Sequence, residues 1–229
     1  MTRTVSREEW LVARREFLDR EKAFDRERDA LAAARRELPR VKIDKPYAFR
    51  THDGEKSLLD LFEGRPQLIV YHFMLGPNKT EGCTGCSYIA DNIAVGWQHF
   101  AARDTAFTLV SRAELPAIDA FKKRMGWEMP WVSSAGSDFN VDFGVTFLTD
   151  EAARQYNYGR GQPGAGDRPG LSCFVRDNDD VFHTYSTYSR GIDMLLTTYN
   201  YLDLTPLGRH EDGLPHPMAW VKHHDKYAR

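Results

Sequence analysis

The sequence contains few cysteines and no long hydrophobic run. Its 229 residues include three cysteines, a small, odd number that does not suit a framework of structural disulfides. The longest strongly apolar stretch, residues 68–75, is interrupted by His72 and is too short to cross a bilayer core of about 30 Å as a helix. The sequence therefore predicts neither a disulfide-stabilised fold nor a membrane-spanning helix.

An excess of charge of one sign is also lacking. Lys and Arg number 31, Asp and Glu number 33, and the formal net charge is −2, so there is no broad basic surface of the kind that dominates nucleic-acid affinity. The first residues run into a charged segment without the apolar core of a secretory signal. We therefore expect a cytoplasmic protein that binds neither nucleic acid nor a membrane.

Residues 1–40 form a charged N-terminal extension with the pattern of one long helix. Ser6 and Glu9 have the spacing of a capping box, and Pro39 ends the pattern. Large apolar side chains recur every seven residues, at Trp10, Phe17, Phe24, Leu31 and Leu38. This narrow stripe predicts a helix over about 6–38 that lies across another surface. That surface is either the chain's own domain or a second copy, which would make the helix a homodimer arm.

Residues 41–205 have the pattern of one α/β domain. Residues 67–74 and 106–111 are rich in β-branched and aromatic side chains, which predicts two buried core strands. A helix is predicted over about 84–102. Ser111 and Glu114 again have capping-box spacing and predict a helix that continues to about 125. Alternating strands and helices favour a largely parallel sheet with helices on both faces.

The second half of the domain has a weaker pattern. Residues 159–170 are rich in Gly and Pro and predict a loop, whose relation to any site is open. Residues 171–176 and 181–185 flank a polar connection and predict a hairpin. A last helix is predicted over about 191–201. We interpret residues 206–229, which contain several prolines and histidines, as a tail packed on the domain.

The residues that can carry chemistry follow the first core strand. Cys83 and Cys86 form a CxxC motif at the start of the predicted helix. Free N–H groups at a helix start stabilise a thiolate, and such placement lowers a thiol pKa from about 8.5 to about 3.5–7.5. Cys83 is therefore the expected nucleophile. Cys86, one turn later, is expected to resolve a mixed disulfide on Cys83.

The cysteines and one glycine motif also allow other interpretations. A zinc site needs two further ligands, and only the adjacent pair His223 and His224 accompanies the CxxC motif, so we expect no metal. Two buried, inert cysteines are the remaining structural alternative. Cys173 lies in an apolar strand and is expected to be inert. Residues 159–164 match GxGxxG but follow no strand, so we expect no dinucleotide cofactor.

Several segments resemble a known family. The order of elements around the CxxC motif resembles the thioredoxin superfamily, in particular its peroxiredoxin-like branch. The closer resemblance, over nearly the whole chain, is to the bacterial family called domain of unknown function 899. The matching segments are Gly82-Cys-Thr-Gly-Cys-Ser, Arg124-Met-Gly-Trp, Pro130-Trp-Val-Ser-Ser, Gly136-Ser-Asp-Phe-Asn, Asp142-Phe-Gly-Val and Val181-Phe-His-Thr-Tyr-Ser-Thr-Tyr.

The resemblance implies a thioredoxin-like three-layer α/β/α fold with a mixed central sheet and a predicted dithiol–disulfide oxidoreductase activity without a cofactor. Two departures matter. Peroxiredoxins carry Pro-x-x-x-Thr-x-x-Cys, whereas here Pro77 and Thr80 precede Cys83 with one residue fewer. Thioredoxins place a cis-proline opposite the CxxC motif, whereas residues 170–177 have no proline beside Ser172.

Three further residues are candidates for supporting roles. Thr80 is expected to form a hydrogen bond near the sulfur. Arg112, just after the second core strand, could stabilise a thiolate or bind an anionic substrate, or it is simply a solvated side chain. His183 could move protons during thiol exchange, or it is a structural histidine.

The sequence therefore leaves three hypotheses for the function. The first is a thiol–disulfide oxidoreductase that takes a disulfide substrate and a dithiol reductant. The second is a thiol-dependent peroxidase that uses the same cysteine on a peroxide. The third is a redox-silent thioredoxin-fold module that binds a partner through its long helix.

Overall fold

The structure, a computed structural model, describes residues 3–228. The chain divides into two compact units, Met1–Pro39 and Arg40–Arg229, which are considered separately. No helix in the described part of the chain is long and apolar enough to cross a membrane.

The first unit consists of the helix α1 (Arg7–Arg36), close to the predicted range. The predicted capping box is present, because the Glu9 amide donates to Ser6 Oγ at 3.2 Å and the Ser6 amide donates to the Glu9 carboxylate at 2.9 Å. Acidic side chains in the first turn and basic ones in the last turn complement the helix dipole. Whether its apolar stripe packs on the chain's own domain or on a second copy stays a prediction.

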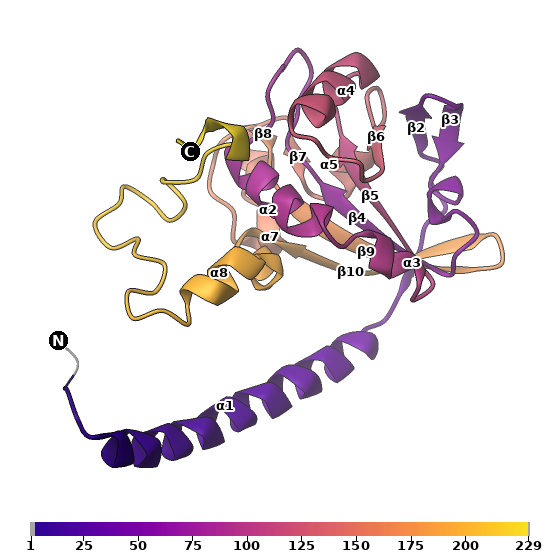
Figure 1. The fold of residues 1–229 in the computed structure, drawn as a ribbon. Coiled ribbons are helices and arrows are strands. Elements are labelled where there is room, and N and C mark those ends of the chain that lie inside the picture. The colour runs from indigo at the N-terminus through magenta and orange to yellow at the C-terminus, as the bar shows by residue number, and fades with distance from the viewer. Residues whose placement is uncertain (1–2, 229) are drawn as a thin grey trace. The chain divides into compact units, whose positions relative to one another are not determined.

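The described part of the second unit contains ten strands, the two longer helices α2 and α4, and several short helices (Figure 1). The strands are β1 (Val41–Lys42), β2 (Ala48–Thr51), β3 (Gly54–Ser57), β4 (Gln67–His72), β5 (Thr105–Ser111), β6 (Trp131–Ser133), β7 (Thr146–Phe147), β8 (Gly166–Asp167), β9 (Gly170–Asp177) and β10 (Asp180–Tyr188). The helices are η1 (Asp60–Phe62), α2 (Thr84–Ala94), α3 (Gln98–Ala101), α4 (Leu115–Arg124), α5 (Phe139–Asp142), α6 (Asp150–Ala153), α7 (Tyr156–Gly159), η2 (Ser189–Leu195), α8 (Thr197–Leu202) and η3 (His224–Lys226).

Eight of the strands form one mixed sheet in the order β1-β10-β9-β4-β5-β6-β2-β3. The strands β4, β5 and β6 are parallel, whereas β9 is antiparallel to both β4 and β10. The order β10-β9-β4-β5, with α2 as the next element of the chain after β4, is the thioredoxin-like arrangement, so the predicted fold class is confirmed. The sheet is mixed rather than largely parallel because the predicted hairpin, now β9 and β10, occupies one half of it.

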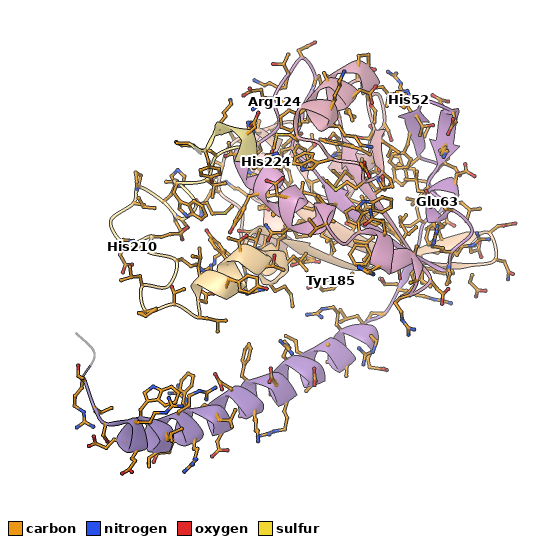
Figure 2. The ribbon with its side chains drawn as sticks, in the orientation of Figure 1. His52, Glu63, Arg124, Tyr185, His210 and His224 are labelled. Atoms are coloured by element: carbon orange, nitrogen blue, oxygen red, sulfur yellow. The ribbon has the colours of Figure 1, made fainter. Side chains whose placement is uncertain are left out.

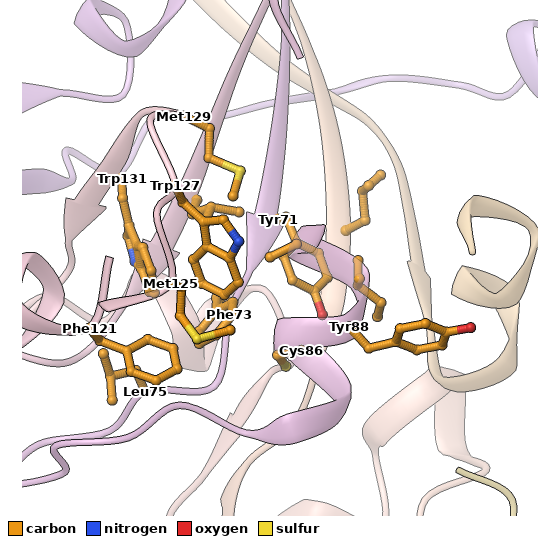
Figure 3. Close-up of a cluster of buried hydrophobic side chains, with 14 of the residues drawn as sticks. Tyr71, Phe73, Leu75, Cys86, Tyr88, Phe121, Met125, Trp127, Met129 and Trp131 are labelled. Atoms are coloured by element: carbon orange, nitrogen blue, oxygen red, sulfur yellow. The ribbon is translucent and has the colours of Figure 1, made fainter. Parts of the chain in front are cut away.

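The sheet is covered on both faces, which gives the three predicted layers. On one face, α2, α4 and α8 pack over a cluster in which Phe73, Trp127 and Trp131 lie together and Cys86 lies near Tyr71 (Figure 3). On the other face, η1 and α5 cover a second cluster. That cluster includes Phe49, Phe62, Leu68, Val70, Phe139, Phe143 and Phe174. Burial of these two faces is the main source of stability.

Some element boundaries differ from the prediction. The helix predicted over 84–102 ends at Ala94, and Gly96, a poor helix former, separates it from α3. The helix predicted over 191–201 is divided into η2 and α8. This division frees the Thr198 amide at the start of α8 to donate to Asn92 Oδ1 at 3.0 Å.

The capping box predicted for Ser111 and Glu114 is not formed. The helix α4 starts at Leu115 with Glu114 as an N-cap that makes no side-chain cap bond. The Ser111 hydroxyl is buried and instead donates to the Phe73 carbonyl at 2.8 Å, while Trp131 Nε1 donates to it at 3.0 Å. Burial between strands therefore prevents this serine from acting as a cap.

Removing the Phe139 ring tests the second cluster. Phe139 is fully buried and packs against Phe49 and Phe143, so Phe139→Ala is expected to lower the free energy of unfolding by about 3–5 kcal/mol. The measurement is denaturant unfolding. On the same short helix Val141 is 40% exposed, and Val141→Ala should change stability by less than about 0.5 kcal/mol. Equal losses in the two variants would contradict this description of the core.

Candidate functional site

Both cysteines of the CxxC motif are held by the backbone of Met74, which follows β4. The Cys83 amide donates to the Met74 carbonyl at 3.1 Å. The Met74 amide donates to the Cys86 sulfur at 3.4 Å. The end of β4 therefore fixes the positions of the two cysteines relative to each other. This is the strand-to-helix junction at which the sequence placed them.

Cys83 is the N-cap residue of α2 and is partly exposed. The hydrogen bond from the Cys86 thiol is the main cause that lowers the pKa of Cys83, and the amides of Cys86 and Gly85 contribute as well. Burial opposes this shift, and the resulting pKa is about 6. The sulfur is therefore mostly ionised at neutral pH, and a thiolate is the reactive form of cysteine.

Cys86 is buried and is oriented toward the interior, close to the Tyr71 ring (Figure 3). Burial is the main cause that raises the pKa of its thiol well above the usual value, and the adjacent Cys83 raises it further. Cys86 therefore stays protonated while Cys83 is ionised. The pair therefore consists of a partly exposed sulfur of low pKa and a buried, protonated thiol that donates a hydrogen bond to it.

A cavity of about 430 Å³ lies next to Cys83. Its walls come from α2, from the segment that includes η2 and the start of α8, and from the tail after α8. The lining residues are Met74, Cys83, Gly85, Cys86, Ile89, Pro169, Ser189, Arg190, Ile192, Asp193, Leu196, Tyr199, Arg209, Glu211, Pro217 and Met218. The cavity therefore gives a small molecule access to Cys83.

The tail forms part of the cavity wall and is fixed there by Glu211. One oxygen of its carboxylate accepts hydrogen bonds from the Tyr199 hydroxyl at 2.7 Å, the Met218 amide at 2.9 Å and Trp220 Nε1 at 2.6 Å. Burial raises the pKa of Glu211, but these hydrogen bonds lower it further, so the net shift is downward. The ionised carboxylate is therefore the form that accepts the hydrogen bonds from the tail.

A second set of contacts fixes the tail to the loop before Cys83. Arg124 on α4 pairs with Glu81 at 2.6 Å and with Asp225 at 2.8 Å. His223 Nε2 lies 2.9 Å from the Gly82 carbonyl. His224, which belongs to the C-terminal segment (Figure 2), lies 2.7 Å from Asp91 on α2. The tail therefore contacts the cysteine loop as well as the cavity.

The structure does not bring the three predicted supporting residues to the cavity. Thr80 is exposed in the loop before α2. Arg112 pairs with Asp167 at 2.8 Å. His183 packs against the Phe143 ring in the second cluster, on the other face of the sheet, and lies 2.7 Å from Ser186 Oγ. His183 is therefore a half-buried residue that contacts Ser186 and Phe143 and does not line the cavity beside Cys83.

Sequence reasoning missed two contributors to the site. Pro169 lines the cavity directly before β9. It lies three residues before Ser172, the position beside which thioredoxins would have their proline. Its peptide bond is trans, because residues 3–228 include no cis peptide bond. Glu211 is the other. An acidic residue in a Pro-rich tail carried no signal, because its role depends on contacts with α8 and with its own tail.

Cys173 packs against the first cluster but does not line the cavity. Within the described part of the chain, no group of three or more His, Cys, Asp or Glu side chains is arranged to hold a metal ion.

Comparison with known proteins gives a family for the chain. A family model described as a bacterial protein of unknown function, DUF899, matches residues 1–227. The chain belongs to this family. No curated protein matches the sequence.

Solved structures similar to this DUF899 protein include two peroxide-related proteins. The peroxidoxin BcpB of Mycobacterium tuberculosis is 16% identical, with 72% of this chain and 97% of that chain covered and a TM-score of 0.44. The bacterioferritin comigratory protein of Xanthomonas campestris, whose structures concern alkyl peroxide reduction, is 16% identical, with 71% and 94% covered and a TM-score of 0.44.

The pKa of Cys83 gives a pH prediction. Below about pH 6 the sulfur is protonated and unreactive, and above it the thiolate predominates, so alkylation of Cys83 by iodoacetamide should rise with pH to half its maximum near 6. An ordinary thiol reaches that point near about 8.5. Mass spectrometry of the labelled peptide measures the rate.

Two variants test the cause of the low pKa. Cys86→Ala removes the hydrogen-bond donor and should move the midpoint upward. Cys86→Ser retains an O–H donor and should move it less. A wild-type midpoint near that of an ordinary thiol, or a midpoint unchanged in Cys86→Ala, would contradict the assignment.

Gly82 allows the cysteine loop of the DUF899 protein to lie against the core. A Cβ atom at this position would lie 2.4 Å from the Phe73 ring and 2.9 Å from the Phe121 ring. Gly82→Ala should therefore lower the free energy of unfolding by about 1–3 kcal/mol and raise the pKa of Cys83. Gly96→Ala is the control, since its nearest atom is 3.7 Å away. Unfolding curves that coincide for the two variants would refute this role.

Proposed function

We propose that this protein is a dithiol–disulfide oxidoreductase that uses Cys83 as the nucleophile and Cys86 as the resolving cysteine. The observation that carries the proposal is the pair itself, in which a partly exposed sulfur of low pKa accepts a hydrogen bond from a buried thiol of high pKa. This difference assigns a separate role to each cysteine. The adjacent cavity supplies a route for the substrate.

The reaction proceeds by two exchanges. The Cys83 thiolate attacks one sulfur of a substrate disulfide, the substrate S–S bond breaks, and the departing thiolate takes a proton from solvent. Cys86 then loses its proton, attacks the Cys83 sulfur and releases the second half of the substrate. The substrate gains two electrons, and the cysteine pair becomes a disulfide. A dithiol reductant restores the pair, and a compartment that keeps thiols reduced, such as the cytoplasm, suits this cycle.

Disulfide exchange is supported better than peroxide reduction. Cleavage of an O–O bond needs hydrogen-bond donors where negative charge develops on the departing oxygen. Thr80 and Arg112, which the sequence predicted as polar groups near the sulfur, do not line the cavity, and Arg112 is paired with Asp167. Exchange between sulfurs requires only an ionised nucleophile, a second thiol and access, which the site provides.

Substitution of each cysteine tests the proposal. Reduced protein is mixed with bis(2-hydroxyethyl) disulfide, and a dithiol supplies electrons for turnover. Cys83→Ser should reduce the rate to that without protein. Cys86→Ser should accumulate a mixed disulfide on Cys83, visible as an added mass of one substrate half. Cys173→Ser is the matched control and should retain the wild-type rate.

Other outcomes would assign a different function. Turnover by Cys83→Ser would exclude Cys83 as the nucleophile. Consumption of hydrogen peroxide without turnover of the disulfide would assign peroxidase activity. Cysteines that remain reduced across a wide range of redox buffers would assign a redox-silent binding module.

A further inference from the structure

The cavity beside Cys83 has the size of a small-molecule site and mostly apolar walls. Its volume of about 430 Å³ lies within the usual range for small ligands, about 300–1,000 Å³. The side chains of Ile89, Ile192, Leu196 and Met218 supply much of the wall. Such a surface binds a ligand mainly through the removal of apolar area from water.

The charged groups around the cavity are already engaged with one another. Arg209 binds both oxygens of Asp203 at 2.9 Å, contacts Asp193 at 3.3 Å and lies over the Tyr199 ring. Glu211 accepts three hydrogen bonds from protein groups. Arg190 also pairs with Asp193, at 3.1 Å, and 81% of its side chain is exposed to solvent. Among the described residues that line the cavity, both arginines therefore already have an acidic partner when an anionic ligand approaches.

From these observations we infer that the cavity binds one half of a small, neutral, apolar disulfide and that the enzyme reacts poorly with anionic disulfides. The inference rests on the proposed function and adds the substrate class to it. The electron and proton balance is that of the two exchanges above, with an apolar thiol released at each step and a dithiol as the reductant.

The physical reason for the selectivity is desolvation. A carboxylate on the substrate would lose water against apolar walls without gaining a partner, and it would also approach the negative Cys83 sulfur. A neutral ring or alkyl chain loses no such hydration and buries apolar area. The tail, held by Glu211, forms one wall of the cavity in which that ring or chain would lie.

The test uses two disulfides that differ in charge but have nearly the same shape. They are 5,5′-dithiobis(2-nitrobenzoate), a dianion, and its uncharged bis-amide. The single-turnover rate of the full-length reduced protein is measured with each reagent. Each rate is divided by the rate at which 2-mercaptoethanol, a neutral thiol without a cavity, reacts with the same reagent. The normalised ratio is the resulting value for the neutral reagent divided by that for the anionic reagent. We expect this normalised ratio of neutral to anionic rates to be at least about tenfold above one, a difference of about 1.4 kcal/mol.

A variant with an added cation tests the cause. Met218→Lys places an ammonium group on the cavity wall and should raise the rate with the dianion, which lowers the ratio toward one. Leu207→Lys is the matched control, because Leu207 lies in the same tail, is 71% exposed and does not line the cavity. It should leave the ratio unchanged. The wild-type ratio decides the inference even where Met218→Lys does not fold.

Failure of the inference and failure of the proposed function give different results. If the protein reacts with both reagents faster than 2-mercaptoethanol does and releases two thiols per molecule of substrate, but shows a ratio near one, the substrate class is wrong and the oxidoreductase stands. If neither reagent reacts faster with the protein than with 2-mercaptoethanol, and Cys86 releases no second thiol, the proposed function fails. The inference then fails with it.

Discussion

The hydrogen bond from the buried Cys86 thiol to the Cys83 sulfur is the interaction on which the site depends. It forms because the turn at the start of α2 directs one cysteine toward solvent and the other toward the core, and because the backbone of Met74 binds both. The donor is retained because burial keeps the Cys86 thiol protonated. The thiolate on Cys83 is thus stabilised by the same burial that makes Cys86 inaccessible.

The tail extends this arrangement to the choice of substrate. Without residues 209–218 the cavity would lack one wall, and Cys83 would lie on a more open surface. The carboxylate of Glu211 and the ion pairs of Arg124 hold the tail in two places, one beside the cavity and one beside the loop that carries Cys83. The tail, which is far from Cys83 in sequence, therefore contacts both the cavity that leads to the Cys83 sulfur and the loop that positions this sulfur.

The sequence predicted the features that depend on interactions between residues close together in the chain. The capping box of Ser6 and Glu9, the core strands, the hairpin and the CxxC motif at a strand-to-helix junction could all be found in the sequence, because each depends on neighbouring residues. Arg112 and His183 could not be placed, because an ion pair with Asp167 and packing against Phe143 depend on distant segments. The contributions of Glu211 and Pro169 were missed for the same reason.

The most direct test of the central claim is the equilibrium between the dithiol and disulfide forms in graded redox buffers, with peptide mapping of the oxidised protein. The account predicts one two-electron transition, a disulfide that joins Cys83 to Cys86, and a Cys173 thiol that stays reduced. It also predicts a less negative reduction potential than in Gly82→Ala, because the stabilised Cys83 thiolate favours the reduced form. The absence of a transition, or a disulfide that includes Cys173, would contradict the account.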